Sequence, residues 1–228
     1  MTIVRTFSVF ILTIIIALGS AGYLFAEVST VQRDQSVQDV RLSSLSSQVF
    51  MLGRDLESPL VLAAAVELTS DIPTDPNNCS TDIGTDMIIP QDGIQPCTST
   101  RMIEELAGAA RAHEHEIWSQ YARNMASQVS NRASSDAIIE QGGSIPPNSD
   151  VVIFHSFEGG EVAAVSAISW SNLDVSVEVY DQDDNFIAEA GGNRSTAFLE
   201  WIPQGSSEFK IKVINANDSP MDFTISSN

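Results

Sequence analysis

The chain has 228 residues, of which 43% are hydrophobic, so it is long enough for one large domain or two small ones. It carries 30 acidic residues against 11 basic ones, which gives a formal net charge of -19. This charge argues against binding to nucleic acid and against docking on an anionic membrane through a basic patch. A soluble acidic surface is the favoured interpretation, and an acidic cation-binding role is the alternative.

A membrane segment is predicted at the N-terminus. Residues 6–26 contain no charged side chain and would rise about 30 Å as a helix, enough to cross a hydrocarbon core. Arg5 precedes this run and Glu27 follows it, which leaves the N-terminus in the cytoplasm and exports the remainder. The length favours an uncleaved single-pass anchor, with the bulk of the chain extracytoplasmic, or periplasmic in a Gram-negative bacterium. Small or tolerated residues at the positions that a signal peptidase reads, Gly-Ser-Ala at 19–21 and Leu-Phe-Ala at 24–26, leave a cleaved signal peptide and secretion as the alternative.

The two cysteines, Cys79 and Cys97, lie on either side of a loop rich in Asp, Pro, Gly and Thr. Two cysteines around one irregular loop in an exported protein predict a disulfide that closes the loop 79–97. Loop closure of this length would stabilise the fold by about 3 kcal/mol. A redox pair or a thiolate metal site is the alternative, which the absence of a CxxC motif disfavours.

A heptad pattern follows the membrane segment. Residues recur at alternating steps of three and four, and we call these nine positions the heptad seam: Val28, Val31, Gln35, Gln38, Leu42, Leu45, Val49, Leu52 and Leu56. The pattern predicts an amphipathic helix that Pro59 bends or ends. The favoured interpretation packs the seam inside an intramolecular bundle. The alternative is a coiled coil with a protein partner or a second copy, in which the glutamines fix the register.

A second helix is predicted from residues 98–100, whose hydroxyl groups can cap it, to about Asn131. Its apolar stripe has the same spacing and comprises Ile103, Leu106, Ala110, His113 and Ile117, with Trp118, Tyr121 and Met125 on one side. The two helices would form a hairpin packed seam to seam and tied by the disulfide. Residues 27–139 are therefore expected to form a helical hairpin or stalk.

The stretch AHEHEIW, residues 112–118, holds two of the three histidines and suggests a zinc site. His113 and His115 are about 200° apart around a helix axis, however, whereas a helical zinc pair needs a spacing of three or four residues. We therefore assign His113 to the apolar stripe and His115 to the outer face. His155 is predicted on a partly exposed strand. A metal-dependent hydrolase is accordingly a disfavoured third function.

The periodicity changes after residues 140–150, a segment dense in Gly, Pro, Ser and Asn that predicts a linker. Seven short runs rich in Val, Ile, Phe and Thr follow, at residues 150–157, 161–170, 174–181, 185–190, 196–201, 208–215 and 221–227. They predict an antiparallel β-sandwich over residues 151–228. The expected fold class is α+β, in which a membrane-spanning helix continues into a helical hairpin and a jelly-roll-like sandwich follows.

Two motifs in the sandwich resemble the bacterial pre-peptidase C-terminal domain. A strand and hairpin match at Val179, Tyr180, Asp181, Asp184, Ile187 and Ala188, and a W-x-P-x-G corner with its following strands matches at Trp201, Pro203, Gly205, Phe209, Ile211, Val213 and Phe223. Asn185 stands where the hairpin usually has Gly, and Asn also enters left-handed conformations. The resemblance covers about residues 148–228. It implies a small sandwich that is appended to secreted proteins and has no catalytic residues of its own.

Residues 181–185 have the Asp-x-Asp-x-Asn opening of a calcium loop, but Phe186 and Gly192 stand where such a loop needs Gly and Glu. A hairpin turn explains these acidic residues, and calcium binding is the alternative. No catalytic residue, metal or cofactor is expected. The favoured function is a non-enzymatic, membrane-anchored extracytoplasmic accessory protein, whose stalk presents the sandwich to a partner or larger assembly. The alternative is a secreted ligand- or envelope-binding module.

Overall fold

The computed structural model describes residues 21–70, 72–73, 79–80, 98–112, 115–129 and 138–228, and for 21–34 and 79–80 it describes the backbone alone. The chain divides into two units, Met1–Asp34 and Gln35–Asn228. Within the described ranges, no helix is both long enough and apolar enough to cross a membrane. The predicted membrane segment, residues 6–26, lies outside these ranges except for residues 21–26.

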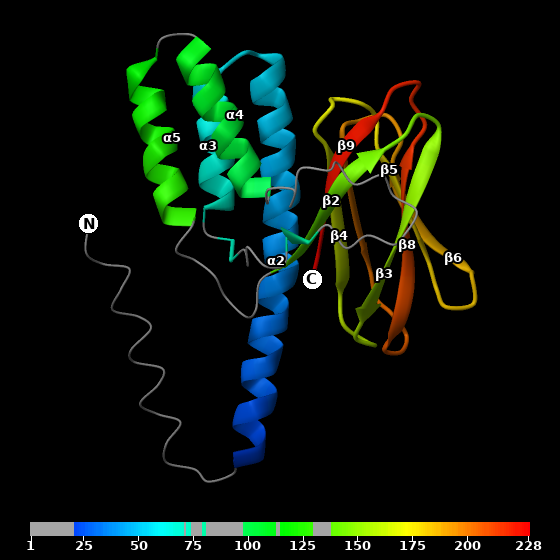
Figure 1. Ribbon diagram of the computed structural model, residues 1–228. Coiled ribbons are helices and arrows are strands. Elements are labelled where there is room, and N and C mark those ends of the chain that lie inside the picture. The colour runs from blue at the N-terminus through cyan, green and yellow to red at the C-terminus, as the bar shows by residue number, and fades with distance from the viewer. Residues whose placement is uncertain (1–20, 71, 74–78, 81–97, 113–114, 130–137) are drawn as a thin grey trace. The chain divides into compact units, whose positions relative to one another are not determined.

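Four helices are described (Figure 1). The first two are separated by a short segment that ends before Pro59. They are α2 (Ala21–Asp55), α3 (Pro59–Thr69), α4 (Thr98–Ala112) and α5 (Glu116–Val129). The predicted long helix is confirmed as α2, and Pro59 starts α3 at a position where its missing N–H is not needed. The Ser58 side chain accepts a hydrogen bond from the Val61 N–H and caps α3.

The segment predicted as a single second helix forms two helices, so the predicted hairpin of two helices is wrong. It begins at Thr98 as expected, but α4 ends at Ala112 and α5 begins at Glu116. No Gly or Pro marks this break in the sequence. The predicted stripe fails at the same point, because Ile117 is 79% exposed. The apolar residues that the sequence places beside the stripe are the ones that pack inward in α5: Trp118, Tyr121 and Met125.

The heptad seam is divided between a packed and an exposed side, which bears out the favoured interpretation only in part. Leu42 and Val49 are half-buried and pack against the apolar cores of the chain. Leu45, Leu52 and Leu56 are 48%, 52% and 61% exposed, so they do not pack inside an intramolecular bundle. The buried face of α2 is instead rich in serine and includes Val40, Ser43, Ser44, Ser46, Ser47, Phe50 and Met51. Small hydroxyl side chains allow a close approach to neighbouring elements, and the Ser46 hydroxyl donates to the Ala65 carbonyl in α3 at 2.7 Å.

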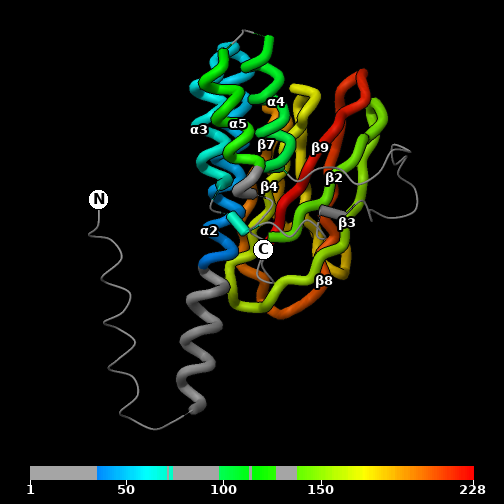
Figure 2. Tube along the Cα trace, turned by 60° about the vertical axis from the view of Figure 1, so that its left-hand side comes forward, coloured from blue at the N-terminus to red at the C-terminus, as the bar shows by residue number. Residues whose placement is uncertain are grey.

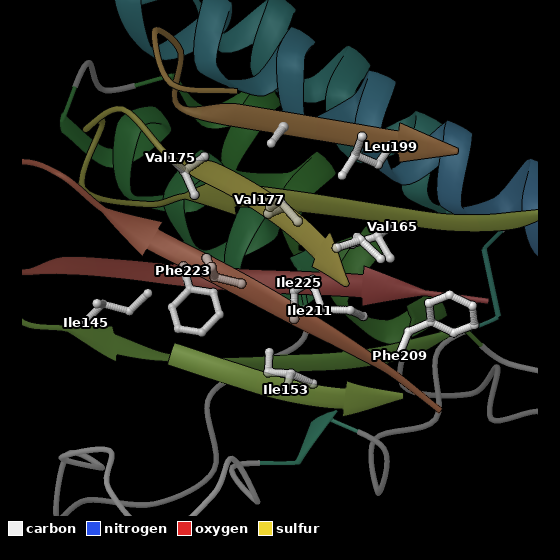
Figure 3. Packing of buried hydrophobic residues seen from close by; sticks show 14 of the residues in the cluster. Ile145, Ile153, Val165, Val175, Val177, Leu199, Phe209, Ile211, Phe223 and Ile225 are labelled. Atoms are coloured by element: carbon white, nitrogen blue, oxygen red, sulfur yellow. The ribbon is translucent and has the colours of Figure 1, made fainter. Parts of the chain in front are cut away.

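All seven predicted strands are confirmed, and they form a sandwich of two sheets (Figures 1 and 2). The strands are β3 (Ser149–Phe157), β4 (Ala163–Ser169), β5 (Ser176–Tyr180), β6 (Phe186–Gly191), β7 (Thr196–Trp201), β8 (Ser207–Asn215) and β9 (Met221–Ser227). The first sheet has the order β1-β2-β9-β4-β7 and the second β3-β8-β5-β6. Alternate side chains of both sheets meet in one apolar core, which includes Ile153, Phe209, Val165, Phe223 and Ile225 (Figure 3).

The predicted linker is largely a strand, which is a second correction. β2 (Ile139–Ile145) pairs antiparallel with β9 along its whole length, and the two-residue β1 (Cys79–Ser80) pairs parallel with β2. The two glycines of this segment misled the sequence interpretation, since Gly is usually depleted in strands. The sandwich therefore begins at Ile139, and not at residue 151 as the sequence predicts.

The helices cover the outer face of the first sheet, so they form a layer and not a stalk. Every residue of β4 is buried, which means that both of its faces are covered. Trp170, just after β4, lies in the helix-side core: its ring contacts Phe50 edge-on at 5.9 Å, and its Nε1 donates to Thr224 Oγ1 at 2.9 Å. Arg101 of α4 lies over the same ring at 4.6 Å.

A buried carboxylate joins the helical layer to the sandwich. Glu140, in β2, accepts hydrogen bonds from the Thr98 N–H at the start of α4 (3.0 Å) and from the Ser226 hydroxyl of β9 (3.1 Å). Ser226 in turn lies 3.5 Å from the hydroxyl of Ser43 in α2. Burial raises the pKa of Glu140, and the hydrogen bonds from Thr98 and Ser226 oppose that shift. We call this group the Glu140 joint.

Substitutions at Glu140 test the joint. Glu140→Ala leaves the Thr98 N–H buried without its acceptor and should lower the free energy of unfolding by about 3 kcal/mol. Glu140→Gln keeps an acceptor for Thr98 and a donor for Ser226, so its effect should be smaller. Because the folded-state pKa lies above the ordinary value of 4.5, the wild type should lose stability relative to Glu140→Gln as pH rises through that pKa. Denaturant titrations across pH measure this, and identical pH profiles would contradict it.

Candidate functional site

A groove lies at one end of the sandwich, where the β5–β6 turn meets the corner between β7 and β8. It has a volume of about 560 Å³ and is lined by residues 181–183, Ile187, residues 201–207 and Phe209. We call it the hairpin–corner groove. The two motifs that resemble the pre-peptidase C-terminal domain supply both of its walls, although they are separated by a strand in the sequence.

The β5–β6 wall is held by Asp181. Its Oδ1 accepts from the backbone N–H groups of Asp183 and Asn185, both at 2.9 Å, and the Asn185 side chain donates to both carboxylate oxygens. These hydrogen bonds, first those from Asn185, lower the pKa of Asp181. The carboxylate therefore closes the turn, as the favoured interpretation predicts. The left-handed residue is Asp184 (φ 61°), not Asn185 as the motif comparison suggests.

The corner wall is held by a close approach of two backbone segments. The Gly160 N–H donates to the Pro203 carbonyl at 2.7 Å, and the Gly159 N–H donates to the Ser206 hydroxyl at 3.0 Å. A Cβ atom on Gly159 would lie only 2.5 Å from the Cα of Gly205, whereas a Cβ atom on Gly205 would meet no described atom within 4 Å. The turn after β3 therefore fixes the corner, and Gly159 is a site residue that the sequence did not reveal.

An aromatic cluster forms the floor of the groove. The Trp201 ring contacts Phe157 edge-on at 4.8 Å and lies 5.7 Å from Phe209. Its Nε1 is buried and has no hydrogen-bond partner among the described residues. A buried donor without a partner carries a free-energy penalty.

The rim of the groove combines apolar and acidic side chains. Ile202 is 64% exposed and Ile187 is 39% exposed, so two large aliphatic groups face solvent at the same opening. The lining contains Asp181 and Asp183 and no basic residue. An anionic ligand would be repelled here, and an apolar, neutral or cationic ligand would not.

Neither of the two described histidines, His115 and His155, lines this groove. His155 lies half-buried on β3, where its Nε2 is 3.0 Å from the Asn228 main-chain oxygen, and burial lowers its pKa. This agrees with the predicted partly exposed strand position. His113 lies outside the described residues, and His115 is exposed between α4 and α5. In the ranges that the structure covers, no three His, Cys, Asp or Glu side chains form a group that could hold a metal ion.

The predicted disulfide cannot be placed, since Cys97 lies outside the described residues, and Cys79–Cys97 stays a prediction. The neighbours of both cysteines belong to the Glu140 joint. Cys79 is the β1 residue in register with Glu140, and Thr98, which follows Cys97 in the sequence, donates its N–H to the same carboxylate.

Comparison with known proteins finds solved structures that are similar to part of the chain. No protein-family model and no curated protein matches this sequence. Among solved structures, the chain is similar to the pre-peptidase C-terminal domain of collagenase from Bacillus anthracis, with 11% identity over 39% of this chain and 87% of that one, at a TM-score of 0.35.

Two other solved structures are similar over the same share of the chain. One is a periplasmic inhibitor of g-type lysozyme from Aeromonas hydrophila, with 10% identity over 40% of this chain and 84% of that one, at a TM-score of 0.32. The other is a carbohydrate-binding module in complex with calcium and xylotriose, with 14% identity over 37% of this chain and 78% of that one, at a TM-score of 0.26.

The described part of the chain is α+β, with an antiparallel β-sandwich. The pre-peptidase C-terminal domain that its motifs resemble is among the solved structures to which the chain is similar. The sandwich is confirmed by its own strand pairing. The helical layer is an addition that the motifs do not include.

Two glycine substitutions test the corner. Gly159→Ala should lower the free energy of unfolding by about 2 kcal/mol, because the new methyl group overlaps the Gly205 backbone. Gly205→Ala is the matched control and should change stability by less than about 0.5 kcal/mol. Denaturant unfolding of both variants measures the difference, and equal effects would refute the close approach.

Proposed function

We propose that this chain is a non-enzymatic, extracytoplasmic interaction protein whose sandwich binds an extended, apolar polypeptide segment in the hairpin–corner groove. The observation that carries the proposal is the pairing of a groove of about 560 Å³ with two exposed isoleucines at its rim. Solvent-exposed aliphatic side chains that rim a concavity are characteristic of sites that bind a partner.

The composition of the groove supports a binding role over catalysis. The Asp181 carboxylate is engaged in closing its own turn, and the lining contains no histidine, cysteine or lysine that could act as a base or nucleophile. The remaining polar groups include the amides of Gln182 and Gln204, which can orient a ligand by hydrogen bonding.

A polypeptide suits this surface better than a polysaccharide. Aliphatic contacts such as Ile187 and Ile202 favour apolar side chains. In addition, Ile187 belongs to β6, which is the last strand of its sheet, and an extended segment can add to such an edge through main-chain hydrogen bonds. The secreted envelope-binding alternative predicts a glycan in the same groove.

The extracytoplasmic location rests on residues 6–26 alone. Their uncharged run supports a single-pass anchor, which would keep the sandwich close to the membrane surface. Retention of the protein in the membrane pellet after a high-salt wash would support the anchor, and its release into the soluble fraction would favour cleavage.

Charge substitutions at the rim test the groove. The full chain with Ile187→Asp and Ile202→Asp is immobilised on a sensor surface and exposed to an envelope fraction. It should bind at least about 10-fold less material from that fraction than the immobilised wild type binds. Phe154→Asp is the matched control, since Phe154 is 61% exposed on β3 at the opposite edge of the same sheet.

Protease treatment of the envelope fraction separates the two ligand classes. Loss of binding after proteolysis supports a polypeptide, and binding that survives proteolysis contradicts it in favour of a glycan. Equal retention by the wild type and the rim variant would contradict the groove as the site.

A further inference from the structure

A second pocket lies at the turn between β6 and β7, where the chain crosses from the last strand of one sheet to the last strand of the other. It has a volume of about 260 Å³. Gln48 of α2 forms one side, and residues 190–191, 193–194 and 196–198 form the rest. We call it the Arg194 pocket. It shares no lining residue with the hairpin–corner groove, so it is a separate candidate site.

The turn that supplies Arg194 is held on both sides by its backbone. The Gly192 N–H donates to the Val175 carbonyl, and the Val175 N–H donates to the Arg194 carbonyl, both at 2.9 Å. The Ser195 carbonyl accepts from the Ser169 N–H at 2.7 Å. The backbone of the turn is therefore fixed before a ligand arrives, which reduces the free energy that binding spends on ordering the site.

Arg194 carries a charge that no described side chain neutralises. Five other described bases form ion pairs with carboxylates: Arg41, Arg54, Arg101, Lys210 and Lys212. Among the residues that the structure describes, the Arg194 guanidinium has neither an ion-pair partner nor a hydrogen-bond acceptor, although the chain has 30 acidic residues. Its N–H donors are therefore available to a ligand.

The surroundings of Arg194 keep acidic groups out of the pocket. Its described lining contains no Asp or Glu. Glu200, the only acidic residue of β7, is paired with Arg41 of α2. Glu189 of β6 lies on the opposite side of its strand from Ala190, which packs against the sandwich core and lines the pocket. In a chain of net charge -19, the lining of this pocket does not repel an anion.

The other polar groups of the pocket can donate hydrogen bonds to an oxyanion. The lining includes the amide of Asn193 and the hydroxyl of Thr196. The Gln48 amide donates one N–H to Ser44 Oγ at 3.4 Å and has a second N–H to offer. A planar guanidinium matches a carboxylate through two parallel hydrogen bonds. The pocket has room for about nine water-sized groups of about 30 Å³ each, enough for a carboxylate with a short organic chain.

The charge balance favours a carboxylate over a phosphate. A carboxylate carries one negative charge, which the single arginine of the lining neutralises. A phosphate monoester carries about -1.5 to -2 at pH 7, so excess negative charge would remain on the surface of an acidic protein.

We propose that the Arg194 pocket is a carboxylate-binding site, in which the Arg194 guanidinium binds the carboxylate of a small organic acid or of a polypeptide. This inference is independent of the proposed groove function, because the two sites have different lining residues. An extended polypeptide can nevertheless reach both sites. Ile187 of the groove and Gly191 of the pocket are four residues apart on β6, or about 13 Å.

A titration of the full chain with sodium acetate tests the site. The protein is kept in mild detergent, and nuclear magnetic resonance follows the backbone N–H groups of Asn193 and Thr196 and the side-chain Nε–H groups of arginine. Acetate replaces sodium chloride at constant ionic strength, because screening alone changes the stability of an acidic chain. The Asn193, Thr196 and Arg194 resonances should shift and saturate. The resonance of Arg111, which is exposed at the end of α4, should not.

Two arginine variants separate the pocket from a general effect of charge. Arg194→Gln should raise the acetate dissociation constant at least about 10-fold, because the charged donor is lost. Arg111→Gln is the matched control: it removes the same charge from an exposed arginine outside the pocket and should leave the dissociation constant unchanged. Circular dichroism spectra establish that both variants are folded. Thr196→Val removes a neutral donor of similar shape and should weaken binding about threefold if Arg194→Gln does not fold.

A peptide acid distinguishes the two sources of the carboxylate. Tighter binding of N-acetyl-dialanine than of acetate supports a polypeptide carboxylate, and equal or weaker binding supports a small organic acid. The C-terminal amide of the same peptide should not bind the pocket. Shifts that do not saturate, unchanged binding by Arg194→Gln, binding of the amide as tight as that of the acid, or saturation by inorganic phosphate at a lower concentration than acetate would overturn the proposal.

Discussion

The arrangement of the described fold depends on one buried carboxylate. Glu140 lies in β2, and its two oxygen atoms accept from the start of α4 and from β9, whose Ser226 lies beside α2. A buried carboxylate is unfavourable unless its acceptor sites are satisfied, so each of these partners is constrained in position. The joint therefore fixes a helix, two strands and a second helix relative to one another through a single side chain.

The covered sheet explains why the proposed groove lies where it does. Because the helices occupy the outer face of the first sheet, β4 and β9 have small or hydroxyl-bearing residues on that side, such as Ala164, Ser166 and Thr224. The packed helices occupy this face. The end of the sandwich, where Trp201 and Ile202 lie, remains accessible. The proposed groove thus lies where the helical layer does not cover the sandwich.

The strands and the long helix could be predicted from the sequence because their signals are local. Alternation in runs such as residues 208–215 and the proline at position 59 act within a few residues. The helical layer could not be predicted in the same way. Two features of the sequence relate to this layer. Every residue of β4 is buried, but in the sequence β4 looks like an ordinary apolar strand. Glu140 is a buried carboxylate, but it lies in a segment rich in glycine. Gly159 was missed because its constraint is a contact with Gly205, which is distant in sequence. The side of α2 that faces the chain was missed because several of its buried side chains are serines, which do not mark an apolar face in the sequence.

The most direct test asks whether the helical layer and the sandwich unfold together. Two single-tryptophan variants each report on one part. The first retains Trp118 in α5 and the second retains Trp201 in the sandwich. In each variant the other tryptophans are replaced by Phe. If the Glu140 joint makes Gln35–Asn228 one cooperative unit, fluorescence from both variants will show coincident denaturant midpoints and equal slopes. A Trp118 transition that is complete before the Trp201 transition begins would contradict this account, since the helices would then be a separate stalk.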